Sequence, residues 1–391
     1  MSDTQQKVVP VVVLGLGLSA LGTARSLGRA GLHPYLVCPK GDLAGLTRWT
    51  RGRVLRIPET DDPAVLGVAL EQLGLAGAVL VPCTDEWSEV IAKLCATDGS
   101  SYVTSAPDPE VVELLVDKLS FAETVERLDV PHPRTIAIAE ESELDGLDLD
   151  GFFLKPRHSQ LFARRYHRKA FSFEGLEEAR SAFRMIADVG LGAVLQEFIP
   201  GPPTAHYFID GFVDRTGQIV ALFPRQRLRM FPLDFGNSTL MVSVPLGAVE
   251  GAVASLTKLL TGIGYRGIFS AEFKRDSRDG VFKIVEVNTR PWWFIEFATL
   301  CGVNVALLAY RDALGLELPD SRDYAADVRC VLLPQDARAY RALRKSHELT
   351  LVAWIRSWVG AKPTIFDMTD PLPAVSLPLV IARRAARLSR S

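Results

Sequence analysis

Two short apolar segments that carry polar side chains on one face constrain the fold of this chain most strongly. Their polar residues are Glu272 within 269–274, and Glu286, Asn288 and Arg290 within 284–290. Side chains alternate between the two faces of a strand, so the three polar residues of the second segment share a face. The turn-forming residues of 276–280 predict an antiparallel hairpin, which brings Glu272 to the same face.

Two carboxylates and an amide oxygen on one face are hard ligands of the kind that Mg²⁺ prefers, together with water and phosphate oxygens. We therefore predict that Glu272, Glu286 and Asn288 bind Mg²⁺, with Mn²⁺ as an alternative. Arg290 adds a fixed positive charge that suits a phosphate. A solvated hairpin with scattered charges is the competing interpretation, but it does not explain why the intervening residues are so apolar.

The first 115 residues alternate between strand and helix patterns. Residues 8–14 form an uninterrupted apolar strand, as parallel sheets require. Further strands are predicted at 35–38 and 78–81, and helices at 19–30, 65–73 and 86–96. This alternation predicts a doubly wound α/β domain over residues 1–115.

A glycine-rich turn follows the first strand. Gly15, Gly17 and Ala20 match a dinucleotide-binding pattern, which suggests an NAD-dependent oxidoreductase. That function needs a carboxylate at the tip of the second strand to hold the ribose. The tip holds Cys38 and Lys40, and Asp42 lies beyond it, so a tight strand-to-helix turn is the favoured interpretation.

The rest of the chain has a different pattern. A proline-rich hinge at 131–133 precedes residues 152–288, whose few long helices predict an α+β fold. Helices are expected at 176–188 and 249–263, and strand pairs join 193–198 to 206–213 and 269–275 to 281–287. Helical stretches return at 305–314 and 337–346.

Composition excludes several classes of protein. The formal net charge of −2 argues against a nucleic-acid partner, because such proteins carry a basic excess. The five cysteines lie far apart, so we expect neither disulfides nor zinc, and a cytoplasmic location. We predict no signal peptide, and no apolar run reaches the ~18 residues that a membrane span needs.

Two further segments suggest nucleotide binding. Lys155 closes a buried strand, where an ammonium group is awkward for packing but useful for a phosphate. Residues 195–199 form an apolar strand edge interrupted by polar groups, which offers backbone hydrogen bonds and an apolar slot to an adenine ring.

Six pieces in order resemble the ATP-grasp superfamily of carboxylate–amine and carboxylate–thiol ligases. They are Asp117-Lys118, 130–133, 154–156, 196–201, Glu272 and 286–290. The resemblance covers roughly residues 8–305. Within the superfamily, residues 81–86 and 225–238 are most similar to the D-aspartate-ligase and exopolysaccharide-associated carboligase types.

The resemblance implies an α/β, Rossmann-like domain at 1–115, an α+β ATP-grasp domain at 116–305 with a lid at about 133–200, and a helical or extended region at 306–391. It implies a ligase that uses ATP to activate a carboxylate as an acyl phosphate and joins it to an amine, releasing ADP and phosphate. Its expected ATP-binding residues are Lys118, Lys155, Gln196, Glu197, Phe198 and Ile199, its metal ligands Glu272, Glu286 and Asn288, and its catalytic arginine Arg290.

Arginines dominate the expected substrate side, where amino-acid-like substrates would bind. Arg225, Arg227 and Arg229 alternate along one stretch, and Arg227 or Arg229 is expected to bind the activated carboxylate, with a solvated face or structural ion pairs as the alternative. At 84–86, a carboxylate either holds the incoming amine or caps the following helix.

Two departures from the superfamily's pattern concern ATP. The loop 157–169 has several arginines and no glycine, so either guanidinium groups replace backbone amides around the phosphates or the loop is a solvated basic hairpin. Pro203 and Thr204 stand where a ribose-binding carboxylate is common. These departures favour the alternative of an inactive, regulatory nucleotide-binding protein. Because the sequence does not identify the acceptor, a carboxylate–thiol ligase is a second alternative.

The C-terminal segment 377–390 is basic and amphipathic. It predicts either weak contact with an anionic membrane or an ordinary surface helix, and the surface helix is favoured. The sequence leaves a homodimer open.

Overall fold

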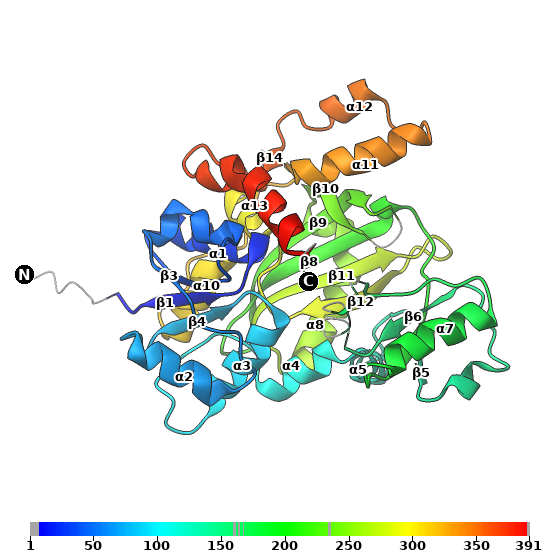
Figure 1. Ribbon diagram of the computed structural model, residues 1–391, viewed down its shortest axis with the longest axis horizontal. Coiled ribbons are helices and arrows are strands. Elements are labelled where there is room, and N and C mark those ends of the chain that lie inside the picture. Colours follow the sequence, from blue (N-terminus) through cyan, green and yellow to red (C-terminus); the bar gives the residue numbers. More distant parts are fainter. Residues whose placement is uncertain (1–7, 159–161, 163–164, 167, 234–235, 389–391) are drawn as a thin grey trace, which may run out of the picture.

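The computed structural model describes residues 8–388, except 159–161, 163–164, 167 and 234–235, with side chains up to Ile381. Within this part of the chain, the strands form three sheets with helices packed on them (Figure 1). The predicted glycine-free loop and the predicted basic C-terminal segment lie partly outside the described residues.

The N-terminal sheet is parallel, as predicted, with strand order β3-β2-β1-β4. Its elements are β1 (Val11–Leu14), α1 (Gly17–Arg29), β2 (Tyr35–Val37), β3 (Val54–Leu55), α2 (Pro63–Gln72), β4 (Val79–Pro82) and α3 (Asp85–Ala96). Val13 packs in a core with α1 and α10 (Val305–Ala313), whereas Val12 packs in another with α2 and α3. Burial on both faces explains the uninterrupted apolar strands.

The glycine turn after β1 is a close approach between backbones. A Cβ atom on Gly15 would lie 2.7 Å from the Cβ of Cys83. The backbone N–H groups of Gly17 and Ala44 both donate to Asp42, each at 2.9 Å. This packing accounts for the glycines and for Asp42 without a dinucleotide.

A small antiparallel sheet has the order β5-β7-β6 and consists of β5 (Thr135–Ile138), β6 (Phe152–Pro156) and β7 (Ala193–Glu197). Helix α7 (Leu176–Ala187) packs on it. The predicted pairing of 193–198 with 206–213 is wrong, because β8 (His206–Val213) belongs to a different sheet. Pro200, Pro202 and Pro203 lie between the two strands and lack the amide donors that a hairpin ladder needs.

The large sheet has seven strands in the order β12-β11-β8-β9-β10-β13-β14. Besides β8, they are β9 (Ile219–Phe231), β10 (Asn237–Ser243), β11 (Gly267–Arg275), β12 (Phe282–Asn288), β13 (Arg329–Val331) and β14 (Lys362–Pro363). The predicted hairpin of 269–275 with 281–287 is confirmed by the antiparallel pairing of β11 with β12. One core joins this sheet to α8 (Glu250–Gly262) and α5 (Lys118–Arg127), and another joins it to α9 (Ile295–Leu300) and α10.

The C-terminal part crosses back over both halves of the molecule (Figure 1). It contains α11 (Leu333–Lys345), α12 (Leu351–Arg356) and α13 (Leu372–Leu388), and helices predicted at 305–314 and 337–346 are confirmed by α10 and α11. Helix α4 (Pro109–Val116) connects the N-terminal part to α5. None of the helices in the described ranges is both long and apolar enough to cross a membrane.

Candidate active site

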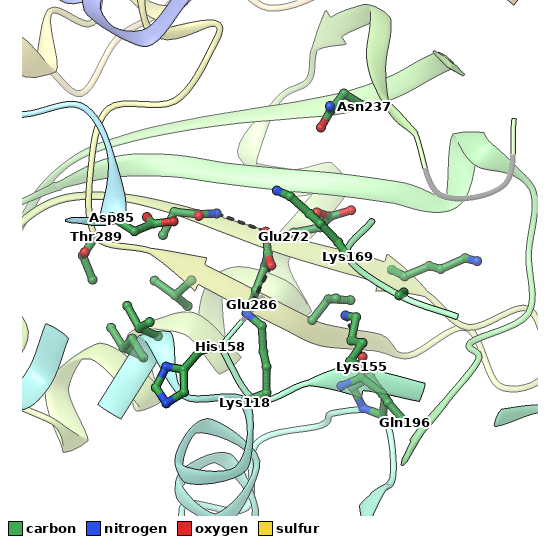
Figure 2. Close-up of a pocket in the computed structure, with 18 of the residues that line it drawn as sticks. Asp85, Lys118, Lys155, His158, Lys169, Gln196, Asn237, Glu272, Glu286 and Thr289 are labelled. Carbon is green, nitrogen blue, oxygen red and sulfur yellow. Dashed lines mark hydrogen bonds and ion pairs between the residues drawn. The ribbon is translucent and has the colours of Figure 1, made fainter. Parts of the chain in front are cut away.

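A cavity of about 490 Å³ lies where the small sheet, the large sheet and helices α3 and α4 meet. Its lining comes from elements that are far apart in the sequence: α3, α4, the start of α5, β6, β7 and the β8–β12 region. Figure 2 shows two carboxylates near its centre, Glu272 and Glu286, with Lys118, Lys155 and Lys169 around them. The cavity therefore combines acidic ligands with a concentration of positive charge.

The acidic hairpin has the geometry that its alternation predicted. Glu272 on β11 and Glu286 on β12 are directly paired, and Asn288 Nδ2 donates to Glu286 Oε1 at 3.2 Å. A β-bulge follows Glu272 and locally shifts the register of the ladder. The three side chains share one face of the hairpin and line the cavity.

Positive charges keep both carboxylates ionised. Burial raises the pKa of Glu286, but the ammonium groups of Lys118, Lys155 and Lys169 outweigh it and lower the pKa to about 2. Burial also opposes the ionisation of Glu272, and Arg227 and His206 outweigh it, so its pKa is lowered as well. Two ionised carboxylates beside an amide oxygen are ready to bind a divalent cation at neutral pH.

The donor set fits a cation that arrives with a polyphosphate. In the described ranges, no three His, Cys, Asp or Glu side chains gather in a way that would hold a metal by themselves. Mg²⁺ keeps several waters and is usually held by one or two carboxylates together with substrate phosphates. Glu272, Glu286 and Asn288 match that requirement.

The three lysines come from three different segments. Asp117 caps the N-terminus of α5, which starts at Lys118, and Lys118 Nζ lies 3.4 Å from Glu286 Oε2. Lys155 Nζ donates to Gln196 Oε1 at 3.0 Å across β6 and β7. Burial and the neighbouring Lys118 lower the pKa of Lys155 to about 8. Lysines concentrated beside ionised carboxylates suit a polyphosphate bridged by a metal.

Phe198 marks the apolar end of the cavity. It is 44% exposed and meets Phe153 edge to face, with ring centroids 6.5 Å apart. Lys274 Nζ lies 4.3 Å from the centre of the Phe198 ring. Ile199 and Glu197 also line the cavity, and the Glu197 carboxylate accepts from the Arg134 backbone and pairs with Arg278. An aromatic wall of this kind suits a flat base.

The predicted arginines occupy different places. Arg227 lines the cavity, where Nη2 lies 3.2 Å from Glu272 Oε1 and Nε donates to Ser238 Oγ at 2.9 Å. Arg229 does not line it and forms a two-pronged ion pair with the buried Asp336.

Arg290 lies just behind the cavity wall. Its Nε donates to Asp85 Oδ1 at 2.5 Å, and its Nη2 donates to Asn288 Oδ1 at 3.4 Å. Burial lowers the pKa of Arg290, but Asp85 outweighs this effect and raises it, so the guanidinium is held charged between α3 and β12. Asp85 itself lines the cavity.

Sequence patterns did not reveal three residues at the site. His206 Nδ1 lies 2.8 Å from Glu272 Oε1, and His158 Nε2 lies 3.3 Å from Asp117 Oδ2. Lys169 lines the cavity from the loop in which the sequence had drawn attention to arginines. Lys169 could have been found in the sequence only as part of a basic run, and an isolated histidine such as His158 or His206 has no pattern that would identify it. Of those arginines, Arg157 pairs with Asp117, and Arg164 lies outside the described residues.

Comparison with known proteins agrees with this geometry. D-aspartate ligase from Enterococcus faecium (strain Aus0004) is 27% identical over 330 residues, which are 80% of this chain and 78% of the relative. N5-carboxyaminoimidazole synthetase from Staphylococcus aureus has a TM-score of 0.64 at 16% identity, covering 86% of this chain and 85% of that chain. L-amino acid ligase from Bacillus licheniformis has a TM-score of 0.59 at 14% identity, covering 79% and 75%. No protein-family model matches the chain.

Fold and site together are similar to those of the ATP-grasp ligases, as the order of the motifs predicted. A similar fold was solved with MgADP in the biotin carboxylase domain of a Hydrogenobacter thermophilus 2-oxoglutarate carboxylase, with a TM-score of 0.63 at 17% identity over 81% of this chain and 72% of that one. The chain has the fold of carboxylate–amine ligases, and D-aspartate ligase is similar to it over most of both sequences.

Proposed function

We propose that this chain is an ATP- and Mg²⁺-dependent ligase that activates the carboxylate of an acidic, D-aspartate-like amino acid as an acyl phosphate and joins it to an amine. The observation that carries the proposal is the convergence of Lys118, Lys155 and Lys169 on the carboxylates of one hairpin. The similarity to D-aspartate ligase supports the choice of acid. Free carboxylates and amines do not condense in water, so the energy of ATP is needed to activate the acid.

The first step transfers the γ-phosphoryl group. A carboxylate oxygen of the acid attacks the γ-phosphorus, the bond to the β-phosphate oxygen breaks, and ADP leaves. Lys118, Lys155 and Lys169 neutralise the phosphate charge, and Glu272, Glu286 and Asn288 would hold the Mg²⁺ that neutralises the rest. Phe198 and Ile199 pack against the adenine, and Gln196 holds Lys155 in place.

The second step forms the amide bond. The ammonium group first gives one proton to water, the resulting neutral amine attacks the acyl carbon, and inorganic phosphate leaves and takes up the second proton that the nitrogen loses. We propose that Arg227 binds the acid, because it lines the cavity beside Glu272, Ser238 and Asn237. Helix α3 contributes Asp85, Glu86 and Glu89 to the lining beside Lys93, and these carboxylates suit an incoming cationic amine.

The proposal assigns different roles to the other two arginines. Arg290 contributes charge to the phosphate site through its position between Asp85 and Asn288. Arg229 anchors the C-terminal part of the chain through Asp336 and does not contact substrate.

We also propose three domains, at 1–115, 116–305 and 306–391, with residues of about 133–200 acting as the lid over ATP. The separate small sheet, which supplies Lys155 and Gln196 to the cavity, supports a lid that closes on the nucleotide. The use of ATP and five unpaired cysteines are consistent with the cytoplasm.

The test is a screen for ADP release. The protein is incubated with Mg-ATP, one acidic amino acid of either configuration, and one amine or thiol acceptor. Release that needs both an acid and an amine supports the proposal. Release with thiols alone identifies a thiol ligase, and nucleotide binding without release for any pair identifies a regulatory protein; either result refutes the proposal.

A further inference from the structure

The C-terminal part of the chain forms a platform, defined here as residues 333–381, that is fixed by two buried ion pairs. Asp336 on α11 is fully buried and pairs with Arg229 at 2.9 Å. At its other end, Asp370 pairs with the fully buried Arg25 at 2.9 Å. Because both anchors are buried, the segment between them is held in a defined position, although it lies at the edge of the molecule (Figure 1).

Helix α12 presents apolar side chains outward from this platform. Trp354 occupies its inner side and Trp358 lies in the turn that follows; the indole N–H groups of both donate to Asp336, at 2.8 and 3.0 Å. The outward side chains and their exposed fractions are Leu351 (49%), Val352 (58%), Ile355 (50%) and Val359 (74%). The spacing of these residues places them on one side of the helix and the turn that follows it. Such clustered exposure indicates an interaction surface.

The charges on the platform are almost all positive. Its exposed cations are Arg338, Arg341, Arg344, Lys345, Arg356 and Lys362. Among the carboxylates, Asp336 and Asp370 are buried in ion pairs, and Asp367 pairs with Arg29. Glu348 is the one exposed carboxylate among residues 333–381. The basic surface contrasts with a whole chain whose formal net charge is −2.

We propose that this platform docks the enzyme peripherally on an anionic lipid bilayer, with the outward side of α12 inserted among the headgroups. Apolar side chains surrounded by exposed cations have the composition of interfacial membrane-binding surfaces. A symmetric dimer through this surface is disfavoured, because the same patch would meet itself and cations would face cations. Helix α12 lies at the outer edge of the molecule, where a flat bilayer can approach it (Figure 1). Docking on a bilayer does not depend on which carboxylate substrate the enzyme activates.

The test is sedimentation of the full-length protein with vesicles. Vesicles that contain phosphatidylglycerol should bind the protein at low salt and release it at high salt, and pure phosphatidylcholine vesicles should not bind it. Val352→Glu/Ile355→Glu should weaken binding by at least about tenfold, and Arg341→Glu/Lys345→Glu should do the same.

Matched control variants introduce glutamates at exposed positions outside the platform. Val68→Glu introduces a charge at a 54% exposed apolar residue on α2, and Arg127→Glu/Arg266→Glu reverses two exposed cations outside the platform. Both should bind vesicles like the unchanged protein. All variants should keep the melting temperature and the ADP release in solution.

Three results would overturn the proposal. One is the absence of binding to phosphatidylglycerol vesicles at low salt, and another is binding that the platform variants leave unchanged. The third is a dimer in light scattering that Val352→Glu/Ile355→Glu converts to a monomer, because the surface would then serve self-association.

Discussion

Glu272 on β11 lies directly opposite Glu286 on β12, so two carboxylates face each other across one pair of strands. Like charges in such positions destabilise a sheet. Here Arg227 and His206 contact the first carboxylate, and Lys118 contacts the second. A pair that needs this much compensation is expected to serve a ligand, and the following predictions test that inference.

Glu286→Gln should reduce ADP release by at least about 100-fold, because the substitution removes one charged ligand of the proposed metal site. Binding of metal-free ADP should be unchanged or tighter, since a negative charge beside the phosphates is gone. Calorimetry with and without Mg²⁺ measures this difference. Glu110→Gln, at an exposed residue of α4, is the control. Normal turnover of Glu286→Gln would refute the metal assignment.

Lys155→Met should raise the melting temperature at pH 7 and abolish turnover. The pKa of Lys155 falls from its usual 10.5 to about 8, so its charged form disfavours the nucleotide-free fold. The unfolded chain binds more protons than the folded one between these two values. Stability of the unchanged protein should therefore rise with pH across this window, and the advantage of Lys155→Met, about 1–3 kcal/mol, should shrink.

Thermal denaturation from pH 7 to 10.5 measures both effects for Lys155. Adding ADP should reduce the pH dependence, because the phosphates favour the charged lysine. A stability difference that is constant with pH would contradict the lowered pKa.

Arg227→Gln should impair substrate binding, whereas Arg229→Met should impair folding stability. Arg227→Gln should raise KM for the acid by about tenfold or more while the fold survives, because a charge-assisted contact is lost. Arg229→Met should cost about 3–5 kcal/mol of folding stability, because the buried Asp336 loses its cation. The KM of its folded fraction should not change. A higher KM for Arg229→Met alone would reverse our assignment.

His206→Asn should raise the Mg²⁺ concentration needed for half-maximal turnover by about tenfold, because His206 holds Glu272 Oε1. Saturating Mg²⁺ should restore most of the turnover. The Mg²⁺ dependence of ADP affinity provides a second readout. His132→Asn, at the hinge, serves as the control, and equal Mg²⁺ dependence of both variants would exclude the positioning role.

The sequence by itself determined the local geometry of the proposed metal-binding face. The alternation of Glu286, Asn288 and Arg290 fixed which side chains share a side, and the turn residues after Glu272 fixed the hairpin. The apolar runs of the N-terminal part likewise determined a parallel sheet buried on both faces. These features depend on repeats of a few residues, which can be recognised within a single short segment of the sequence.

Tertiary structure alone decided which distant segments meet. The pattern of β7 identified a strand but not its partners. The prolines that follow β7 prevent a hairpin, and the next strand, β8, belongs to the large sheet. Arg227 and Arg229 are equivalent in the sequence, yet one reaches the cavity and the other reaches Asp336, 107 residues away. Arg290 meets Asp85 across 205 residues. Such contacts depend on how sheets and helices pack together, and no local periodicity records that packing.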